Sequence, residues 1–209
     1  MQNDILFILK GLGLTVNLYL LTMVFSLPLG VLLSLGRLKN KGIINNVILF
    51  YTSVFRGTPL LLQLFFVYYG LPMLLGLRLT PFTAAVVTFV INYAAYFCEI
   101  FRGSILGIDK GQYEAAKVLG MSYWQTMRRI IIPQSLLTAL PPLSNEAISL
   151  IKDTSLVSAI GMAEILRNSR ELVTRDFSVI PFIICAVMYL LMSVVVIAFF
   201  KKLEEKVMI

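Results

Sequence analysis

The sequence contains no histidine, one tryptophan and two cysteines in 209 residues, and only 14% of its residues are charged. Without histidine the chain has no imidazole pH switch and no histidine-based metal site. Cys98 and Cys185 lie in or at the end of long apolar segments, so we expect neither a disulfide nor redox chemistry from them. The sequence also has no P-loop, no HExxH motif and no paired-aspartate motif, which excludes ATP hydrolysis by this chain and argues against an intramembrane enzyme.

Long apolar runs dominate what is present. Hydrophobic residues make up 58% of the chain, and the mean hydropathy is +0.87. Because a helix needs about 20 apolar residues to cross a bilayer core, we predict an all-α membrane protein with one domain over residues 1–209. Its five predicted spans cover residues 11–36, 46–75, 79–101, 130–151 and 177–200. The first run is too long for a signal-peptide core and has no small-residue cleavage site after it, so we expect it to remain as a helix.

Of the 18 basic residues, 17 are divided unequally between the two sides of these spans, and Arg56 lies within the second span. Eleven lie in the first loop, around the third loop and at the C-terminus: Arg37, Lys39, Lys41, Arg102, Lys110, Lys117, Arg128, Arg129, Lys201, Lys202 and Lys206. Six lie on the other side: Lys10, Arg78, Lys152, Arg167, Arg170 and Arg175. Because cytoplasmic loops are enriched in Lys and Arg, we predict an N-terminus outside the cell and a cytoplasmic C-terminus. The net charge of +7 then reflects topology, and no nucleic-acid partner is expected.

Two features of the spans bear on packing. Ser26, Gly30 and Ser34 recur every four residues in the first span, a spacing that lets helices approach closely in lipid. This pattern indicates either packing within the chain or a contact with a second copy. The fourth span contains three prolines, Pro133, Pro141 and Pro142. Because each proline removes a backbone donor, we expect this span to be broken or kinked.

Residues 152–176 are long for a connection between two spans. The helical spacing of Leu156, Ile160 and Leu166 predicts a short helix near the outer membrane surface. Asp153 or Thr154 is the expected N-cap of this helix.

The segment YEAAKVLGMSYWQTMRRIIIPQ, residues 113–134, interrupts the apolar pattern. Good helix formers precede Gly120, and Ser122 followed by Gln125 predicts a capping box that begins a second helix. The charge distribution places this helix–turn–helix on the cytoplasmic surface. Its mixture of Tyr, Trp, Met and Arg is typical of a protein interface, and the alternative is that Trp124 anchors the segment to lipid headgroups.

The spacing within this segment resembles the cytoplasmic EAA loop of ABC-importer permeases. That pattern is E-A-A, three residues, G, nine residues, I, one residue, L-P. The chain matches it with Glu114, Ala115, Ala116, Gly120, Ile130 and Pro133, and has Ile132 in place of Leu. Residues 55–72, 96–105 and 151–166 resemble segments of the polar amino-acid permeases. The resemblance covers essentially the whole chain, and the family's core topology is five spans with the N-terminus outside.

The resemblance implies a permease subunit of a type I ABC importer in the cell membrane. Two permeases, either copies or paralogues, form the pore, and a solute-binding protein outside the cell delivers an amino acid. A cytoplasmic ATPase dimer docks on the coupling segment, residues 111–129, and drives alternating access. The coupling residues implied are Glu114, Ala115, Ala116, Gly120, Met121 and Trp124. No cofactor is expected in this chain, because ATP and magnesium belong to the ATPase.

Charged side chains within the spans are candidates for functional residues because a charge in lipid is costly. Glu99 and Arg102 lie near the cytoplasmic end of the third span, where we expect them to pair or to reach the membrane surface. Arg56 is expected to pair with Glu99 or to hold a helix end. All three are therefore interpreted as structural.

Glu146 lies deeper, within the fourth span. Because transporter sites gather near the membrane midplane at interrupted helices, we expect Glu146 to bind a cationic group of the substrate. The other expected substrate-binding residues are Asn145, Ser149, Gln63, Thr58, Tyr93 and Asn92. The alternative is that Glu146 makes an interhelical hydrogen bond that fixes the bundle. Lys152 and Asp153 are expected to pair at the outer mouth.

A carboxylate without a counter-charge in the pathway favours a basic amino acid (arginine, lysine or histidine) as the substrate. A glutamine or glutamate importer is the alternative. A protein of a different class, an ATP-independent secondary transporter or channel, would need its own coupling-ion site. The sequence offers no cluster of intramembrane carboxylates for one.

Overall fold

The computed structural model describes residues 2–39 and 42–207, so the prediction for Lys41 in the first loop lies outside the described residues. Helices account for nearly all of the described residues, and these contain no strand. In chain order the elements are α1 (Gln2–Lys10), α2 (Leu12–Lys39), α3 (Ile43–Gly57), α4 (Leu60–Phe65), the π-helix η1 (Phe66–Gly70), α5 (Leu71–Leu75), α6 (Pro81–Leu106), α7 (Lys110–Val118), α8 (Tyr123–Thr126), the π-helix η2 (Met127–Ile131), α9 (Ile132–Asp153), the 3-10 helix η3 (Thr154–Ile160), α10 (Ile165–Asp176) and α11 (Ile180–Val207).

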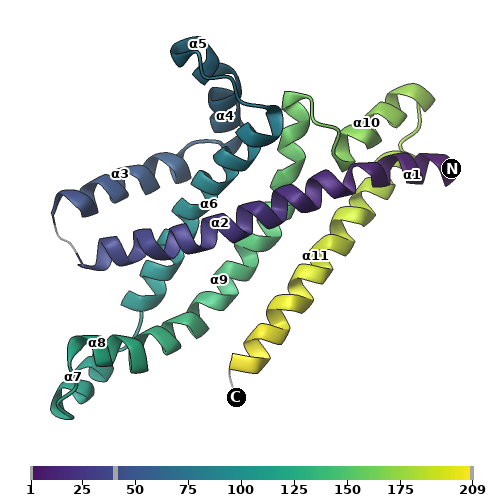
Figure 1. The fold of residues 1–209 in the computed structure, drawn as a ribbon. Helices are drawn as coiled ribbons and strands as arrows, with labels where there is room; N and C mark the ends of the chain where they lie inside the picture. Colours follow the sequence, from purple (N-terminus) through teal and green to yellow (C-terminus); the bar gives the residue numbers. More distant parts are fainter. Residues whose placement is uncertain (1, 40–41, 208–209) are drawn as a thin grey trace.

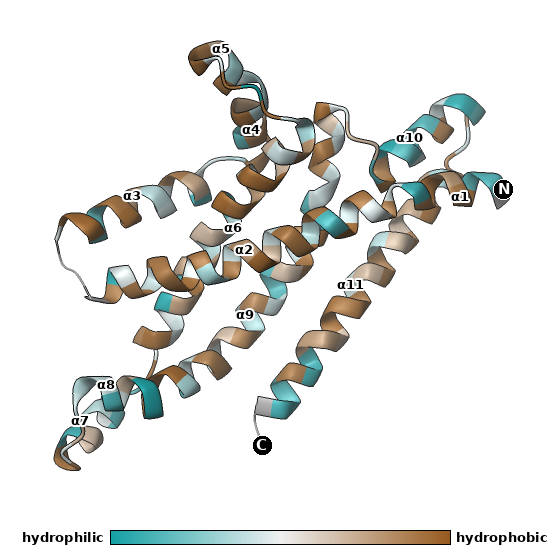
Figure 2. Ribbon diagram, viewed as in Figure 1, coloured by the Kyte–Doolittle hydropathy of each residue, from teal (hydrophilic) through white to brown (hydrophobic). Residues whose placement is uncertain are grey.

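The helices are arranged so that the chain has two distinct ends. Figure 1 shows α7, α8 and the end of α11 at one end of the molecule, and α5, α10 and the start of α1 at the other. Hydrophobic residues cover most of α11, whereas hydrophilic residues cover much of α10 (Figure 2). The first and last residues that the structure describes therefore lie at opposite ends, while the orientation in the membrane stays a prediction.

Three helical segments are long and apolar enough to cross a membrane: Asn3–Leu38, Pro81–Leu106 and Ile180–Lys206. A fourth is added if the bent pair Ile43–Gly57 and Leu60–Leu75 counts as one span. These findings within the described residues confirm the all-α membrane class. The predicted total of five spans is not confirmed, because α9 carries several polar and charged residues and falls outside this set.

The predicted span over residues 46–75 is not one helix. Its two halves, Ile43–Gly57 and Leu60–Leu75, meet at an angle of 104°. Thr58 and Pro59 between them have extended backbones, with ψ angles of 148° and 132°. A proline disfavours helical geometry in the residue before it, and it brings no N–H to continue the ladder. The break therefore has a local cause in the sequence.

The expected break in the fourth span is absent. Pro141 and Pro142 lie inside α9, which runs without interruption from Ile132 to Asp153. Pro133 lies directly after the π-helix η2, which leads into α9 without a gap, so its missing N–H falls at the junction of the two helices. Helix α9 packs against both α6 and α11. These contacts hold it in a helical conformation at Pro141 and Pro142, where two backbone N–H donors are missing.

Helix α2 packs against α6 along most of its length. A β-carbon added at Gly30 would lie 2.6 Å from the β-carbon of Phe97, so only glycine permits this approach. Ser26 and Ser34 on the same stripe are also buried. The four-residue spacing of small residues in the first span therefore serves packing within the chain.

The segment after α9 also differs from its prediction. It forms η3, turns at Gly161 with a φ of +86°, and only then begins α10. The N-cap is Glu164, whose fully buried carboxylate accepts hydrogen bonds from the backbone N–H groups of Leu166 and Arg167, both at 2.6 Å. The Tyr189 hydroxyl on α11 donates to the same carboxylate at 2.8 Å. The predicted cap at Asp153 or Thr154 is wrong because α9 and η3 continue through both residues.

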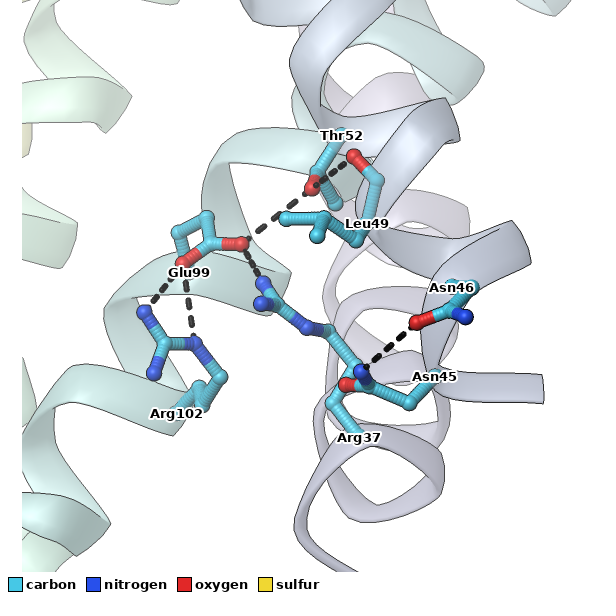
Figure 3. Close-up of polar contacts among 7 residues, drawn as sticks. All are labelled: Arg37, Asn45, Asn46, Leu49, Thr52, Glu99 and Arg102. Carbon is cyan, nitrogen blue, oxygen red and sulfur yellow. Dashed lines mark hydrogen bonds and ion pairs between the residues drawn. The ribbon is translucent and has the colours of Figure 1, made fainter. Parts of the chain in front are cut away.

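A partly buried ion cluster joins α2, α3 and α6 (Figure 3). The Glu99 carboxylate accepts hydrogen bonds from Arg37 on α2 and from the Nε and a terminal nitrogen of Arg102, the latter two at 3.0 and 2.8 Å. The Thr52 hydroxyl on α3 donates to Glu99 at 3.2 Å. The predicted pairing of Glu99 with Arg102 is confirmed, and Arg37 is a second partner that the sequence did not indicate.

We predict that Glu99→Gln lowers the free energy of unfolding by about 1–3 kcal/mol, because Arg37 and Arg102 lose their charged acceptor in a partly buried cluster. Of the two arginines that lose their partner, Arg37 is the more buried, with 9% of its side-chain surface exposed. Denaturant titration of the purified protein in detergent measures the effect. Glu171→Gln on α10 is the matched control, since Glu171 is exposed and forms no ion pair among the described residues. Equal stability of the two variants would contradict the assignment.

Candidate functional site

A cavity of about 520 Å³ lies between the break after α3 and the facing surfaces of α6 and α9. We refer to it as the α6–α9 cavity. Its lining residues are Thr58, Pro59, Leu60, Leu61, Asn92, Tyr93, Tyr96, Glu146, Ser149, Asp153 and Leu156. Five predicted substrate-binding residues are among them: Thr58, Asn92, Tyr93, Glu146 and Ser149. The structure thus brings most of the predicted site together.

Glu146 is a half-buried carboxylate in the wall of this cavity. Within the described residues, 2–39 and 42–207, it forms no hydrogen bond and no ion pair. Ser149, one turn further along α9, lines the same wall. Asn145 differs from these two, because it is exposed and does not line the cavity. The structure therefore offers no support for a substrate contact by Asn145.

The side chains of Gln63 and Asn92 form hydrogen bonds with the backbone at the break between α3 and α4. The Gln63 side-chain amide donates to the Phe55 carbonyl at 2.9 Å, and to the carbonyl and hydroxyl oxygens of Thr58 at 3.1 and 2.8 Å. Asn92 on α6 donates to the same Phe55 carbonyl and to the Gln63 side-chain oxygen, both at 2.9 Å. Both amides are buried, and their hydrogen bonds are used within the chain. They shape the cavity wall, a role that the sequence did not reveal.

Asp153 lines the cavity and does not form the pair with Lys152 that we expect at the outer mouth. Its carboxylate accepts a hydrogen bond from the Tyr93 hydroxyl at 2.7 Å. Lys152 is exposed and forms no ion pair with Asp153. A signal was present in the sequence, since residues seven apart in a helix lie on one face. Asp153 follows Glu146 by seven residues, so two carboxylates share one wall of the cavity.

Arg56 is an exposed residue at the end of α3 and is not itself a lining residue of the cavity. Its guanidinium carbon is 5.4 Å from the centroid of the Tyr96 ring, which lines the cavity. The expected ion pair with Glu99 is absent, because Arg37 and Arg102 occupy both oxygens of that carboxylate. The cavity thus has two carboxylates on α9, and the Arg56 guanidinium lies over the ring of one of its lining residues.

The second candidate site is the helix–turn–helix at the opposite end of the molecule. Gly120 ends α7 with a φ of +71°, a left-handed conformation that other residues adopt only with strain. The N–H of Met121 donates to the Ala116 carbonyl and that of Gly120 to the Lys117 carbonyl, both at 3.0 Å. These bonds form a Schellman motif. The predicted capping box of Ser122 and Gln125 at the start of α8 is confirmed.

Apolar side chains are exposed at this turn. Val118, Leu119, Tyr123 and Trp124 expose 88%, 77%, 59% and 70% of their surface, and we refer to these four residues as the α7–α8 surface. The predicted coupling residues Glu114 and Ala115 are also exposed, whereas Ala116 is fully buried. The sequence did not indicate Val118 and Leu119. The spacing of a motif shows where the helices and the turn lie, but it does not show which side chains are exposed to solvent.

The helix–turn–helix is attached to the body by a small apolar cluster. Met127 and Ile131 of η2 pack with Ile105 of α6 and with Ile108. This cluster lies where α6 ends and α9 begins, so a force on α7 and α8 reaches both helices that line the α6–α9 cavity. Among the described residues, no group of three or more acidic or cysteine side chains is arranged to hold a metal ion.

The family described as binding-protein-dependent transport system inner membrane component matches residues 26–209. The chain belongs to this family. The match includes the helix–turn–helix with its exposed apolar residues and every lining residue of the α6–α9 cavity. The resemblance to ABC-importer permeases seen in the sequence is confirmed.

Individual relatives match nearly the whole chain. It is 40% identical over 204 residues to the glutamine transport system permease protein GlnP of Escherichia coli strain K12, covering 97% of this chain and 93% of that protein. It is 39% identical over 201 residues to the arginine transport system permease protein ArtQ of Bacillus subtilis strain 168, covering 96% and 92%. A crystal structure of an amino acid ABC transporter with histidines matches with a TM-score of 0.88 and 35% identity, covering 96% and 94%.

We predict that Gln63→Leu destabilises the break between α3 and α4. The substitution removes the donor to Thr58 and one of the two side-chain donors to the Phe55 carbonyl, and a buried polar group without a partner costs about 1–3 kcal/mol. Denaturant titration in detergent measures the loss. Asn17→Leu is the control, because Asn17 is exposed on α2 and has no hydrogen bond among the described residues. A Gln63→Leu variant as stable as the control would refute the role of this amide.

Proposed function

We propose that this chain is the membrane-spanning permease subunit of an ATP-driven importer of basic amino acids. A second permease, either a copy or a paralogue, completes the pore. A separate ATPase drives alternating access, and a solute-binding protein outside the cell delivers the substrate. Family membership and the similarity to amino-acid permeases along nearly the whole chain support the amino-acid importer.

The main support for a basic amino acid as the substrate is the carboxylate of Glu146 in the α6–α9 cavity, which has no partner among the described residues. A charge within a membrane-embedded helix bundle is costly, and it persists where a functional partner compensates it. Asp153 adds a second carboxylate to the same wall. Two carboxylates can bind the α-ammonium group and a basic side chain of one substrate. The relatives described as an arginine permease and as an amino acid ABC transporter with histidines fit this class.

Glutamine is the second candidate substrate, and the 40% identity to a glutamine permease favours it. In that case one carboxylate binds the α-ammonium group, and the other stays with its Tyr93 partner. The two candidates differ in whether Glu146 discriminates between a charged and a neutral side chain.

The α7–α8 surface is the proposed docking site for the ATPase. Four exposed side chains, two aliphatic and two aromatic, give it the composition of a protein interface. This chain then contributes no nucleotide chemistry, and ATP and magnesium bind on the ATPase. Movement of the docked ATPase is transmitted through the apolar cluster of Ile105, Ile108, Met127 and Ile131 to α6 and α9.

We predict that the purified permease–ATPase complex binds arginine more tightly than glutamine, and that Glu146→Gln weakens arginine binding about 10-fold to 100-fold. This range corresponds to the loss of one hydrogen bond between charged groups. Calorimetric titration of both amino acids against both proteins measures the effect. Asn145→Ala, the exposed neighbour, is the control and should bind arginine like the wild type. Equal or tighter glutamine binding by the wild type would transfer the assignment to the glutamine alternative.

We predict that the double substitution Val118→Ser and Leu119→Ser weakens association with the ATPase at least 10-fold without lowering the thermal stability of the permease alone. Both side chains are almost fully exposed, so their loss leaves the folded chain intact. Co-purification and ATPase activity of the reconstituted complex measure docking. Phe177→Ser, at the opposite end of the molecule and 96% exposed, is the control. Unchanged association would show that the ATPase docks elsewhere.

A further inference from the structure

Arg56 differs from the other arginines near the middle of the molecule. Arg37 and Arg102 both form ion pairs with Glu99 (Figure 3). Arg56 forms no hydrogen bond and no ion pair with any described residue. Its guanidinium carbon lies over the Tyr96 ring, 5.4 Å from the ring centroid. A guanidinium has five N–H donors and stays charged. In Arg56 all five remain available to a ligand.

The position of Arg56 connects it to the α6–α9 cavity. Tyr96, whose ring lies under the guanidinium, is a lining residue, and Thr58, two residues after Arg56, lines the cavity as well. Glu146 is also a lining residue, and it forms no ion pair with Arg56 among the described residues. An unpaired carboxylate therefore lines the cavity, and an unpaired guanidinium lies over the ring of another lining residue, Tyr96.

Two separated and opposite charges are complementary to a zwitterion. Every α-amino acid carries a carboxylate and an ammonium group, and an arginine fork matches carboxylate geometry with two parallel hydrogen bonds. The cavity volume of about 520 Å³ lies within the range of about 300–1,000 Å³ usual for small-molecule sites. The two free charges can thus be neutralised together by one amino acid.

We propose that Arg56 binds the α-carboxylate of the transported amino acid while Glu146 binds its cationic group. The inference rests on the proposed function of the α6–α9 cavity as an amino-acid site and adds the group that recognises the carboxylate. Arg56 then selects for the amino-acid backbone, and the carboxylates on α9 select for the remainder of the ligand. A site built to bind a charged group rejects analogues that lack it, because its own charge is left unpaired.

The test compares each amino acid with its amide, which lacks the carboxylate charge. Calorimetric titration of the purified permease–ATPase complex uses arginine, argininamide, glutamine and glutaminamide as ligands. The wild type should bind the better amino acid at least 10-fold more tightly than its amide. Arg56→Gln should weaken amino-acid binding about 10-fold to 100-fold and leave amide binding unchanged, so that the preference disappears. Arg56→Lys keeps the charge without the fork and should retain part of the preference.

The controls separate this inference from the proposed function. Arg78→Gln removes an exposed arginine that lies outside the cavity lining, and it should leave every affinity unchanged. Wild-type binding of neither arginine nor glutamine would overturn the amino-acid site itself. Wild-type binding with no preference over the amides, or equal weakening of acid and amide by Arg56→Gln, would overturn the role of Arg56 alone. If Arg56→Gln does not fold, the wild-type preference and the Arg56→Lys variant decide the question.

Discussion

The architecture around the cavity depends on one constraint: backbone carbonyls freed by the break between α3 and α4 need hydrogen-bond donors from the chain itself. Within a bilayer, irregular backbone is tolerated only where the protein satisfies it. Gln63 and Asn92 supply these donors to Phe55 and Thr58. Because Asn92 belongs to α6, the same bonds fix the break against α6. The result is a rigid non-helical segment, residues 58–59, in the cavity wall.

The charges in the middle of the molecule fall into two groups with different environments. Around Glu99 every charged side chain has a partner, and the cluster joins three helices. At the α6–α9 cavity, Glu146 and Arg56 lack ion pairs, and Asp153 is engaged by a tyrosine. Paired charges stabilise a fixed arrangement of helices, whereas unpaired charges remain available to bind a ligand. Helix α6 contributes to both groups and thereby connects the structural cluster to the cavity.

Much of this organisation could be predicted from the sequence, and the remainder depends on contacts between distant segments. The helix–turn–helix was predictable because its signals are local: the E-A-A spacing, a glycine and a capping box. Glu146, Tyr93 and Thr58 were placed in one site by depth alone. The interruption at Pro59 had a local signal but was missed within a long apolar run. By contrast, α9 continues through Pro141 and Pro142 because of its packing against α6 and α11, and no local pattern reports that packing.

The roles of individual polar residues were the least predictable feature. Gln63 and Asn92 were in the right place but have most of their hydrogen bonds within the chain, because an amide can serve a backbone carbonyl as readily as a ligand. Asp153 was assigned to the surface because its neighbour Lys152 suggested a pair. Its helical phase relative to Glu146 was the better guide. The exposure of Val118 and Leu119 depends on how the turn packs against the rest of the chain. Only the three-dimensional structure shows this packing.

The central claim is that the cavity beside the broken helix binds the transported amino acid. The most direct measurement is an electron cryomicroscopy structure of the permease–ATPase complex at saturating arginine, with glutamine in a parallel sample. The account predicts ligand density in the α6–α9 cavity, with one end at Glu146 and the other at Arg56. An empty cavity in both samples would contradict it.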